Sequence, residues 1–219
     1  MSFINIKDGD FGRAFQAFFN NDYKYEYLAY RDQLLISIGV YAAQGNKEGF
    51  ISTAKKALNL GLSPDAIYEM ILTAGLSRGY IAVLTAQELF KNLSLETKGR
   101  DNNPMLDDFN QDYFLQEFNQ LPPWVTFLEA HSPKVLKNYA VLRSQLLTDG
   151  VVQRKTKEML TMLLNTFANN TIGIKSHAIN AMKYGATRSE ILDTLLLGIK
   201  IGGIIVWING VNNLLTELQ

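Results

Sequence analysis

The sequence predicts an all-α fold, and three observations support that prediction. No stretch of the 219 residues shows the alternation of apolar and polar residues that is typical of a strand. Apolar residues instead recur at spacings of three and four, as in Leu160, Leu163, Leu164 and Phe167. Capping residues and glycines divide the chain into helix-length segments. These signals occur twice at a fixed interval, which indicates two tandem copies of one helical unit.

The repeat appears when Thr53 is aligned with His177, an offset of 124 residues (177 minus 53). The segments 46–81 and 170–205 align at this offset without a gap. The identical pairs at this offset are Asn46 and Asn170, Gly49 and Gly173, Ser52 and Ser176, Ala54 and Ala178, Ala57 and Ala181, Gly61 and Gly185, Ile67 and Ile191, Leu72 and Leu196, Gly79 and Gly203, and Ile81 and Ile205. Because the glycines coincide at turn positions, the pattern favours a duplicated supersecondary unit.

Each element of the second copy has its own signal. Its first helix is predicted over 157–167, and its second over 171–184, ending at Gly185 in the left-handed C′ position. Thr187-Arg188-Ser189-Glu190 is a capping box that starts a third helix, which ends at Gly202-Gly203. In the first copy Ser63 caps a helix, and Pro64 takes the first helical position.

The segment between the copies is polar and rich in turn residues over 98–104, so we place a domain boundary at residue 98. This gives a degenerate first domain, 1–98, and a second domain, 99–219. Shorter helices are predicted over 110–119, 125–129 and 132–147.

Composition excludes several functions. The chain has no cysteine, which removes thiolate nucleophiles, redox dithiols and Cys-based zinc sites. With two histidines, we expect no bound metal and no cofactor. The net charge of zero argues against a nucleic-acid partner, because such partners require clustered Lys and Arg. The apolar run 201–211 is too short to span a membrane, so we expect a cytoplasmic protein.

His177 and Glu158 are the candidate catalytic residues. An imidazole and a carboxylate together are the minimal equipment for proton transfer at neutral pH. In the first copy the equivalent positions carry Thr53 and Leu34. Joint presence in one copy and joint absence in the other indicate a pair that works together, although a histidine that only packs remains the alternative.

Asn170 begins the helix that carries His177, and Asn is among the best residues for an N-cap. Free N–H groups at a helix start also bind anions. We therefore expect Asn170, with Gly173 and Ser176 on the turns beside it, to bind the carboxylate of a small substrate.

The string that runs from Lys157-Glu158 through Asn170, Gly173, Ser176-His177, Gly185-Ala186-Thr187, Glu190-Ile191 and Gly202-Gly203 resembles the carboxymuconolactone decarboxylase family, which includes the alkylhydroperoxidase D-like proteins. The resemblance implies an all-helical fold and assembly as trimers or hexamers. In the peroxidase branch the motif is a glutamate followed by Cys-x-x-Cys-x-x-x-His. Glu158 and His177 match its proton-relay residues, whereas Asn170 and Gly173 occupy the two cysteine positions.

The resemblance implies a lyase of the decarboxylase type, with His177 as general acid and base and Glu158 orienting it. The decarboxylase branch carries a Pro-Ala-Ala-Asn-like segment after the glycines, where this chain has Ile204 to Asn209, so the substrate is left open. The alternative is a non-catalytic oligomeric binding or scaffold protein. We expect a homo-oligomer, with a trimer favoured, and a thiol peroxidase is disfavoured because cysteine is absent.

The spacing of the pair poses a geometric question. In a plain hairpin about Asn170, Glu158 and His177 would be offset by roughly 7 Å at 1.5 Å per residue. They would meet if the first helix ended early near Asn165, if the helices crossed steeply, or if a water molecule bridged them. The sequence leaves these three arrangements open.

Overall fold

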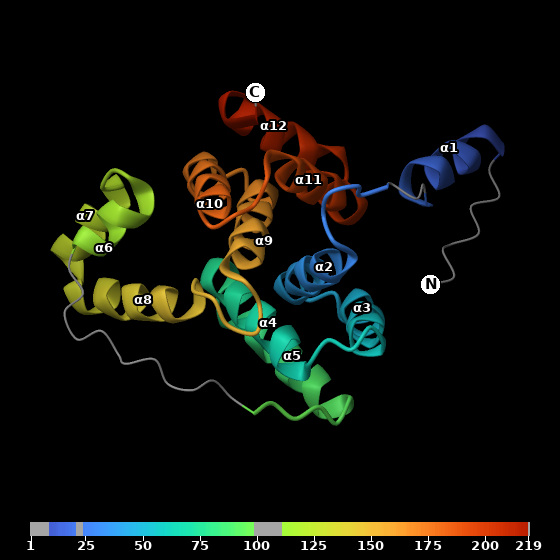
Figure 1. The fold of residues 1–219 in the computed structure, drawn as a ribbon, viewed down its shortest axis with the longest axis horizontal. Coiled ribbons are helices and arrows are strands. Elements are labelled where there is room, and N and C mark those ends of the chain that lie inside the picture. Colours follow the sequence, from blue (N-terminus) through green and yellow to red (C-terminus); the bar gives the residue numbers. More distant parts are fainter. Residues whose placement is uncertain (1–8, 21–23, 99–110, 219) are drawn as a thin grey trace.

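The computed structural model describes residues 9–20, 24–98 and 111–218, and this part of the chain contains twelve helices and no strand (Figure 1). The predicted all-α fold is confirmed. The helices are α1 (Gly9–Asn20), α2 (Tyr30–Gln44), α3 (Lys47–Asn59), α4 (Pro64–Arg78), α5 (Tyr80–Asn92), α6 (Gln111–Phe118), α7 (Pro123–His131), α8 (Pro133–Leu146), α9 (Arg154–Phe167), α10 (Thr171–Lys183), α11 (Arg188–Gly202) and α12 (Ile204–Leu218).

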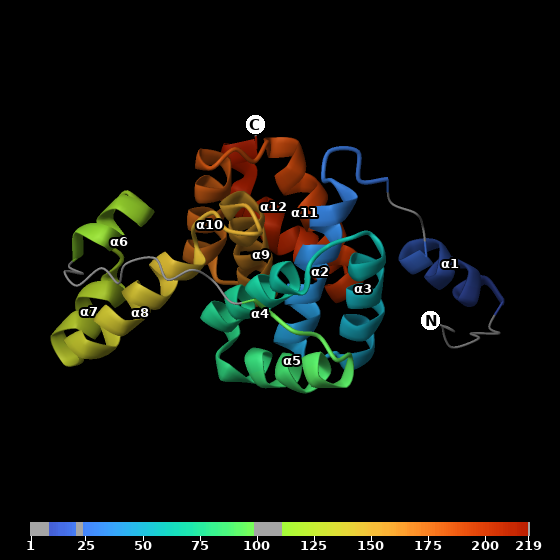
Figure 2. The ribbon, with the colours of Figure 1, turned by 60° about the horizontal axis from the view of Figure 1, so that its bottom comes forward.

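Two groups of four helices form the body of the molecule, and we call α2–α5 the first unit and α9–α12 the second unit (Figure 2). Corresponding helices of the two units begin at the interval found in the sequence. Their first residues are Tyr30 and Arg154, Lys47 and Thr171, Pro64 and Arg188, and Tyr80 and Ile204. The helix boundaries thus follow the sequence repeat, which supports the interpretation that the unit was duplicated.

The same capping chemistry starts the second helix of each unit. The side chain of Asn46 accepts a hydrogen bond from the Gly49 N–H at 2.9 Å, and Asn170 accepts one from the Gly173 N–H at 3.3 Å. Each bond satisfies one of the N–H groups that a helix start leaves without an intrahelical acceptor. The predicted N-cap role of Asn170 is therefore present in the structure.

The third helix of each unit also begins as predicted. Gly61 and Gly185 precede these helices with φ angles of 86° and 96°, in the left-handed region that favours glycine. Ser63 then caps α4, and Thr187 caps α11 in a complete capping box, in which the Glu190 carboxylate accepts from the Thr187 N–H at 2.7 Å. These local signals fix where the helices turn.

Reciprocal polar contacts join the two units. The Glu69 carboxylate on α4 accepts hydrogen bonds from the N–H groups of residues 151 and 152, at 3.2 and 3.1 Å. The Asp193 carboxylate on α11 accepts hydrogen bonds from the N–H groups of residues 27 and 28, at 2.7 and 2.9 Å. Acceptors and donors are related by the same offset, so each unit uses the same position to hold the chain that leads into the other. This is the pattern of a two-fold, isologous contact within one chain.

A shared apolar core lies between the units. One cluster of buried residues includes Ile36 and Met70 from the first unit and Leu160 and Ile191 from the second. Helices α2 and α9 approach closely, since a Cβ on Gly39 would lie 2.4 Å from the Leu160 side chain. The rigid pairing of the units fixes the position of α9, which carries Glu158.

Helices α6, α7 and α8 lie to one side of the two units, and we call them the cap helices (Figures 1 and 2). They have a small apolar cluster of their own, built on Phe114, Val125, Leu136 and Ala140. The three helices agree with the predicted segments to within two residues, except that Asn110, the predicted start of α6, lies outside the described residues. The same holds for residues 99–104 of the predicted linker. The cap helices bring charged side chains to the second unit.

Helix α9 starts at Arg154, three residues before the predicted start at Lys157. The apolar face used for the prediction begins only at Leu160, so it carries no signal from the first turn. Within the described ranges, no helix combines the length and the apolar character that crossing a membrane requires.

Candidate active site

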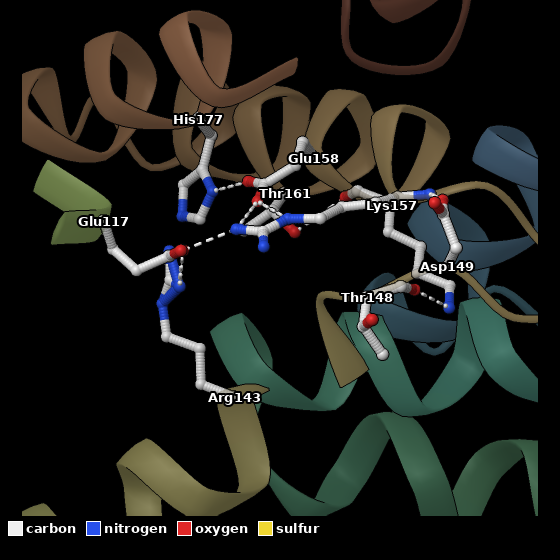
Figure 3. A network of polar contacts seen from close by, with 9 residues as sticks. Glu117, Arg143, Thr148, Asp149, Lys157, Glu158, Thr161 and His177 are labelled. Atoms are coloured by element: carbon white, nitrogen blue, oxygen red, sulfur yellow. Dashed lines mark hydrogen bonds and ion pairs between the residues drawn. The ribbon is translucent and has the colours of Figure 1, made fainter. Parts of the chain in front are cut away.

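Glu158 and His177 meet directly. Glu158 lies in the second turn of α9 and His177 in the middle of α10, and both are buried. Glu158 Oε2 lies 2.6 Å from His177 Nδ1 (Figure 3). Helix α9 continues to Phe167, so neither an early end near Asn165 nor a bridging water is needed. The relative placement of the helices and the reach of the two side chains bring the atoms together.

The ionisation of Glu158 fixes the roles of the ring nitrogens. Burial raises the pKa of this carboxyl, but the hydrogen bond and charge of His177, with the charges of Arg143 and Arg154, outweigh burial and lower the pKa below its ordinary value. An ionised carboxylate only accepts, so Nδ1 carries the proton and donates it. In the neutral ring Nε2 then holds the lone pair and is free to act as a base.

A chain of ion pairs holds Glu158 from behind. Arg154, one helical turn before it, donates to Glu158 Oε1 from both Nε and Nη2 at 3.1 Å. Arg154 Nη2 also lies 2.6 Å from Glu117 Oε2, and the same oxygen accepts from Arg143 Nη1 at 3.2 Å (Figure 3). The guanidinium of Arg154 stacks on the Tyr184 ring at 3.8 Å. The orientation of the Glu158–His177 pair therefore depends on α6 and α8 as well as on α9.

The involvement of Arg154, Glu117 and Arg143 in the site was not predicted from the sequence. Arg154 carries a usable signal, because it stands four residues before Glu158 and such positions are neighbours on a helix. Glu117 and Arg143 lie on the cap helices, at no fixed spacing from either partner. No pattern in the sequence indicates that they join the site.

A cavity of about 500 Å³ opens between the cap helices and the second unit. Ligand pockets typically have volumes of about 300–1,000 Å³. The described residues that line it are Leu76, Ser77, Phe118, Trp124, Leu128, Val135, Tyr139, Arg143, Leu147, Thr161, Asn165, Asn170, Ile172, Gly173 and His177. His177 thus reaches the cavity, and in Figure 3 its second ring nitrogen points away from Glu158.

The predicted substrate-binding residues are partly gathered at this cavity. Asn170 and Gly173 line it, whereas Ser176 is not among the lining residues. Of the two predicted catalytic residues, His177 lines the cavity and Glu158 is not among the lining residues. The Gly173 N–H already donates to the Asn170 side chain, and Asn170 Nδ2 donates to Asn165 Oδ1 at 2.8 Å. A Cβ on Gly173 would lie 2.1 Å from that same Asn165 oxygen. Gly173 therefore allows this close packing.

No group of three or more His, Cys, Asp or Glu side chains suited to a metal ion occurs among the described residues. The ionised groups of the site are instead paired with one another. The arrangement supports proton transfer at Nε2 of His177, with Glu158 to fix the tautomer and stabilise the protonated ring.

One known protein family has a model that matches part of the chain. Residues 9–92 match the model of the carboxymuconolactone decarboxylase family. The resemblance to this family that the sequence predicts is confirmed for this part of the chain. The match covers α1 to α5, which include the first unit, whereas the resemblance described above was strongest in the second. None of the curated proteins matches the chain.

A solved structure shares the fold of this chain. It is a protein from Burkholderia xenovorans LB400, provisionally named a gamma-carboxymuconolactone decarboxylase subunit. The TM-score is 0.60 at 20% sequence identity, and the alignment covers 94% of this chain and 84% of the other. At this identity the similarity establishes the helical fold.

Proposed function

We propose that the chain is a cofactor-free lyase that decarboxylates a small carboxylated compound by acid and base chemistry at His177. The observation that carries this proposal is the 2.6 Å contact between Glu158 and His177 Nδ1, with His177 lining a cavity of ligand size. The name of the structural relative and the family match of residues 9–92 support the same reaction class.

The proposed chemistry uses the protonated ring as an acid. The bond between the substrate carbon and its carboxylate breaks, CO₂ leaves, and the electron pair stays on the substrate, delocalised into its conjugated carbonyl. The proton on His177 Nε2 then moves to the substrate carbon, and the ring takes up another from water. Glu158 stabilises the protonated ring during the cycle and holds it in one orientation.

The test is CO₂ release from γ-carboxymuconolactone, the compound in the name of the structural relative. We expect the parent to turn it over and His177→Ala to lose about 10²–10⁴-fold in kcat, the usual contribution of a positioned acid or base. Thr53→Ala, at the equivalent position of the first unit, is the matched control and retains the parent rate. Parental turnover by His177→Ala would refute the assignment.

A thiol peroxidase mechanism has no support in this sequence. The peroxide-reducing step needs a thiolate that becomes a sulfenic acid or disulfide, and the 219 residues contain no cysteine. Peroxide consumption by the purified protein, above a buffer control, would contradict this view.

A second candidate function is a homo-oligomeric binding or scaffold protein, for which the surface of the two units provides an argument. Tyr80, Ile81 and Leu84 on α5 are exposed. The equivalent residues of α12 are exposed as well, namely Ile204, Ile205 and Ile208. Exposed apolar groups of this kind indicate contact surfaces. Two equivalent patches on one chain fit a ring in which one patch meets the other on the next copy.

We propose a trimer as the ring formed in this way. Sedimentation equilibrium is expected to give three times the chain mass of 24.6 kDa, and Ile205→Glu to give the monomer. A monomeric parent would refute the trimer. An intact trimer that releases no CO₂ and does not depend on His177 would favour the scaffold function over the lyase.

A further inference from the structure

Arg143 is the least satisfied charged residue of the site. It comes from α8, is buried, and lines the cavity that His177 also lines. Its Nη1 donates to Glu117, whereas its Nη2 is buried and has no hydrogen-bond partner among the described residues. Buried polar groups nearly always have a partner, so a buried guanidinium donor that lacks one, on a residue that lines a cavity, needs an explanation.

Glu117 only partly compensates the charge of Arg143. A single oxygen of that carboxylate, Oε2, serves both Arg143 at 3.2 Å and Arg154 at 2.6 Å. Glu117 Oε2 lies closer to Arg154, which also pairs with Glu158. A guanidinium presents N–H groups in a fixed planar fork that matches two oxygens of one carboxylate. The Arg143 guanidinium also lies over the Phe118 ring at 5.1 Å and the Tyr113 ring at 5.9 Å, contacts that provide no hydrogen-bond acceptor in the ring plane of the guanidinium. Arg143 therefore retains a donor for a second anion.

Tyr139 adds a second donor on the same face of α8. It stands one helical turn before Arg143 and lines the same cavity. Burial raises the pKa of Tyr139, with a smaller lowering from the charge of Arg143, so the phenol keeps its proton at neutral pH. An O–H and a guanidinium on one helix face provide two donors for one anionic group.

Apolar side chains surround these donors. Phe118, Trp124, Leu128, Val135 and Leu147 line the cavity beside Arg143 and Tyr139. A ligand that fits this lining combines one carboxylate with a flat, apolar body, and His177 lies on the opposite, α10 side of the same cavity.

We propose that Arg143 and Tyr139 bind the carboxylate of an aromatic or unsaturated acid, and that its apolar body lies between the cap helices and His177. The ligand group is taken to be a carboxylate because the proposed function acts on a carboxylated compound, so this part of the inference rests on the proposed function. The binding itself requires no turnover. The carboxylate is placed at α8 rather than at the start of α10, where the Gly173 N–H is already bonded to Asn170.

Tryptophan fluorescence gives a direct test. The chain has two tryptophans, and Trp124 lines the cavity. In a Trp207→Phe background, Trp124 reports binding of benzoate and of its neutral analogue benzamide. We expect benzoate to bind about tenfold more tightly than benzamide, the range for a hydrogen bond to a charged group. Arg143→Met should abolish the preference, and Tyr139→Phe should reduce it about threefold.

Lys155→Met is the matched control. Lys155 pairs with Glu190 at 2.7 Å, and neither residue lines the cavity, so the preference for benzoate should be unchanged. Equal binding of both probes by the parent, or an unchanged preference in folded Arg143→Met, overturns the proposal. If Arg143→Met does not fold, Arg143→Lys and Tyr139→Phe decide, and a full preference in both variants overturns it.

The outcomes separate binding from catalysis. A preference for benzoate that depends on Arg143, in a protein whose CO₂ release does not depend on His177, leaves this inference standing and removes the lyase. Turnover that depends on His177, without any preference for benzoate, leaves the lyase standing and overturns the inference about Arg143 and Tyr139.

Discussion

The two units of the molecule have the same helix boundaries and caps but differ in what they hold at equivalent positions. In the second unit Glu158 and His177 form a buried polar pair beside a cavity. In the first unit, Leu34 stands in place of Glu158 and packs into an apolar cluster with Phe50 and Ile67. The capping residues and glycines that the two units share mark the same helix boundaries, whereas a few core positions differ and set the Glu158–His177 pair apart from the apolar cluster.

The surroundings of the pair differ as well. The first unit has Tyr30 where the second has Arg154, so it lacks the cation that holds the carboxylate. Glu117 and Arg143 come from the cap helices, which contact the second unit. A site in this fold therefore needs both the substituted core positions and the added helices.

The largest expected effect on stability comes from making the second unit resemble the first. Glu158→Leu removes the partner of His177 and one of the two carboxylates of Arg154, leaving buried polar groups unpaired. We expect the free energy of unfolding to fall by about 3–5 kcal/mol, as measured by urea denaturation. Leu34→Met, which preserves apolar volume at the equivalent position, should cost less than about 1.5 kcal/mol. Equal effects would contradict the distinction between the units.

A smaller effect is expected at the glycines in the first turn of the second helix of each unit. A Cβ on Gly173 would meet Asn165 Oδ1 at 2.1 Å, and one on Gly49 would meet the Tyr41 ring at 2.7 Å. We expect Gly173→Ala and Gly49→Ala each to cost about 1–3 kcal/mol in urea denaturation, because the neighbouring side chain must move.

The side-chain amide of Asn165, which would clash with a Cβ at position 173, offers a control for the second unit. In an Asn165→Ala background, Gly173→Ala should cost clearly less than in the parent. If the cost is the same in both backgrounds, Asn165 is not the group that excludes a side chain at position 173.

Much of the fold was predictable because it is encoded locally. The capping box at Thr187 and the Asn170 cap were identified from spacing alone, and both are present. The pairing of Glu158 with His177 was suggested by their joint absence from the first copy. The contributions of Glu117 and Arg143 were not predictable, because the tertiary packing of α6 and α8 brings them to the site.

The depressed pKa of Glu158 predicts a pH dependence of stability. Its folded-state pKa lies below the ordinary value of 4.5, so its contribution is present above that pH and is lost as the pH falls through the folded-state pKa. Parallel urea denaturation of the parent and Glu158→Gln at pH 7, 5, 4 and 3 should show a smaller loss in the variant. Identical pH profiles would show that Glu158 is not stabilised in its ionised form.

The smallest expected effect is at the helix caps. Asn46→Ala and Asn170→Ala should each cost about 1 kcal/mol in urea denaturation, since each removes one N-cap hydrogen bond. Benzoate affinity should change less than about twofold in both, because the carboxylate is placed at Arg143. A tenfold loss confined to Asn170→Ala would return the anion site to the start of α10.

A double-mutant cycle tests whether Glu158 and His177 act as one catalytic unit. CO₂ release from γ-carboxymuconolactone is measured for the parent, Glu158→Leu, His177→Thr and the double variant, which restores the residues of the first unit. A pair that acts together predicts that the double variant loses no more than His177→Thr alone. Losses that multiply in the double variant would show that Glu158 and His177 act independently.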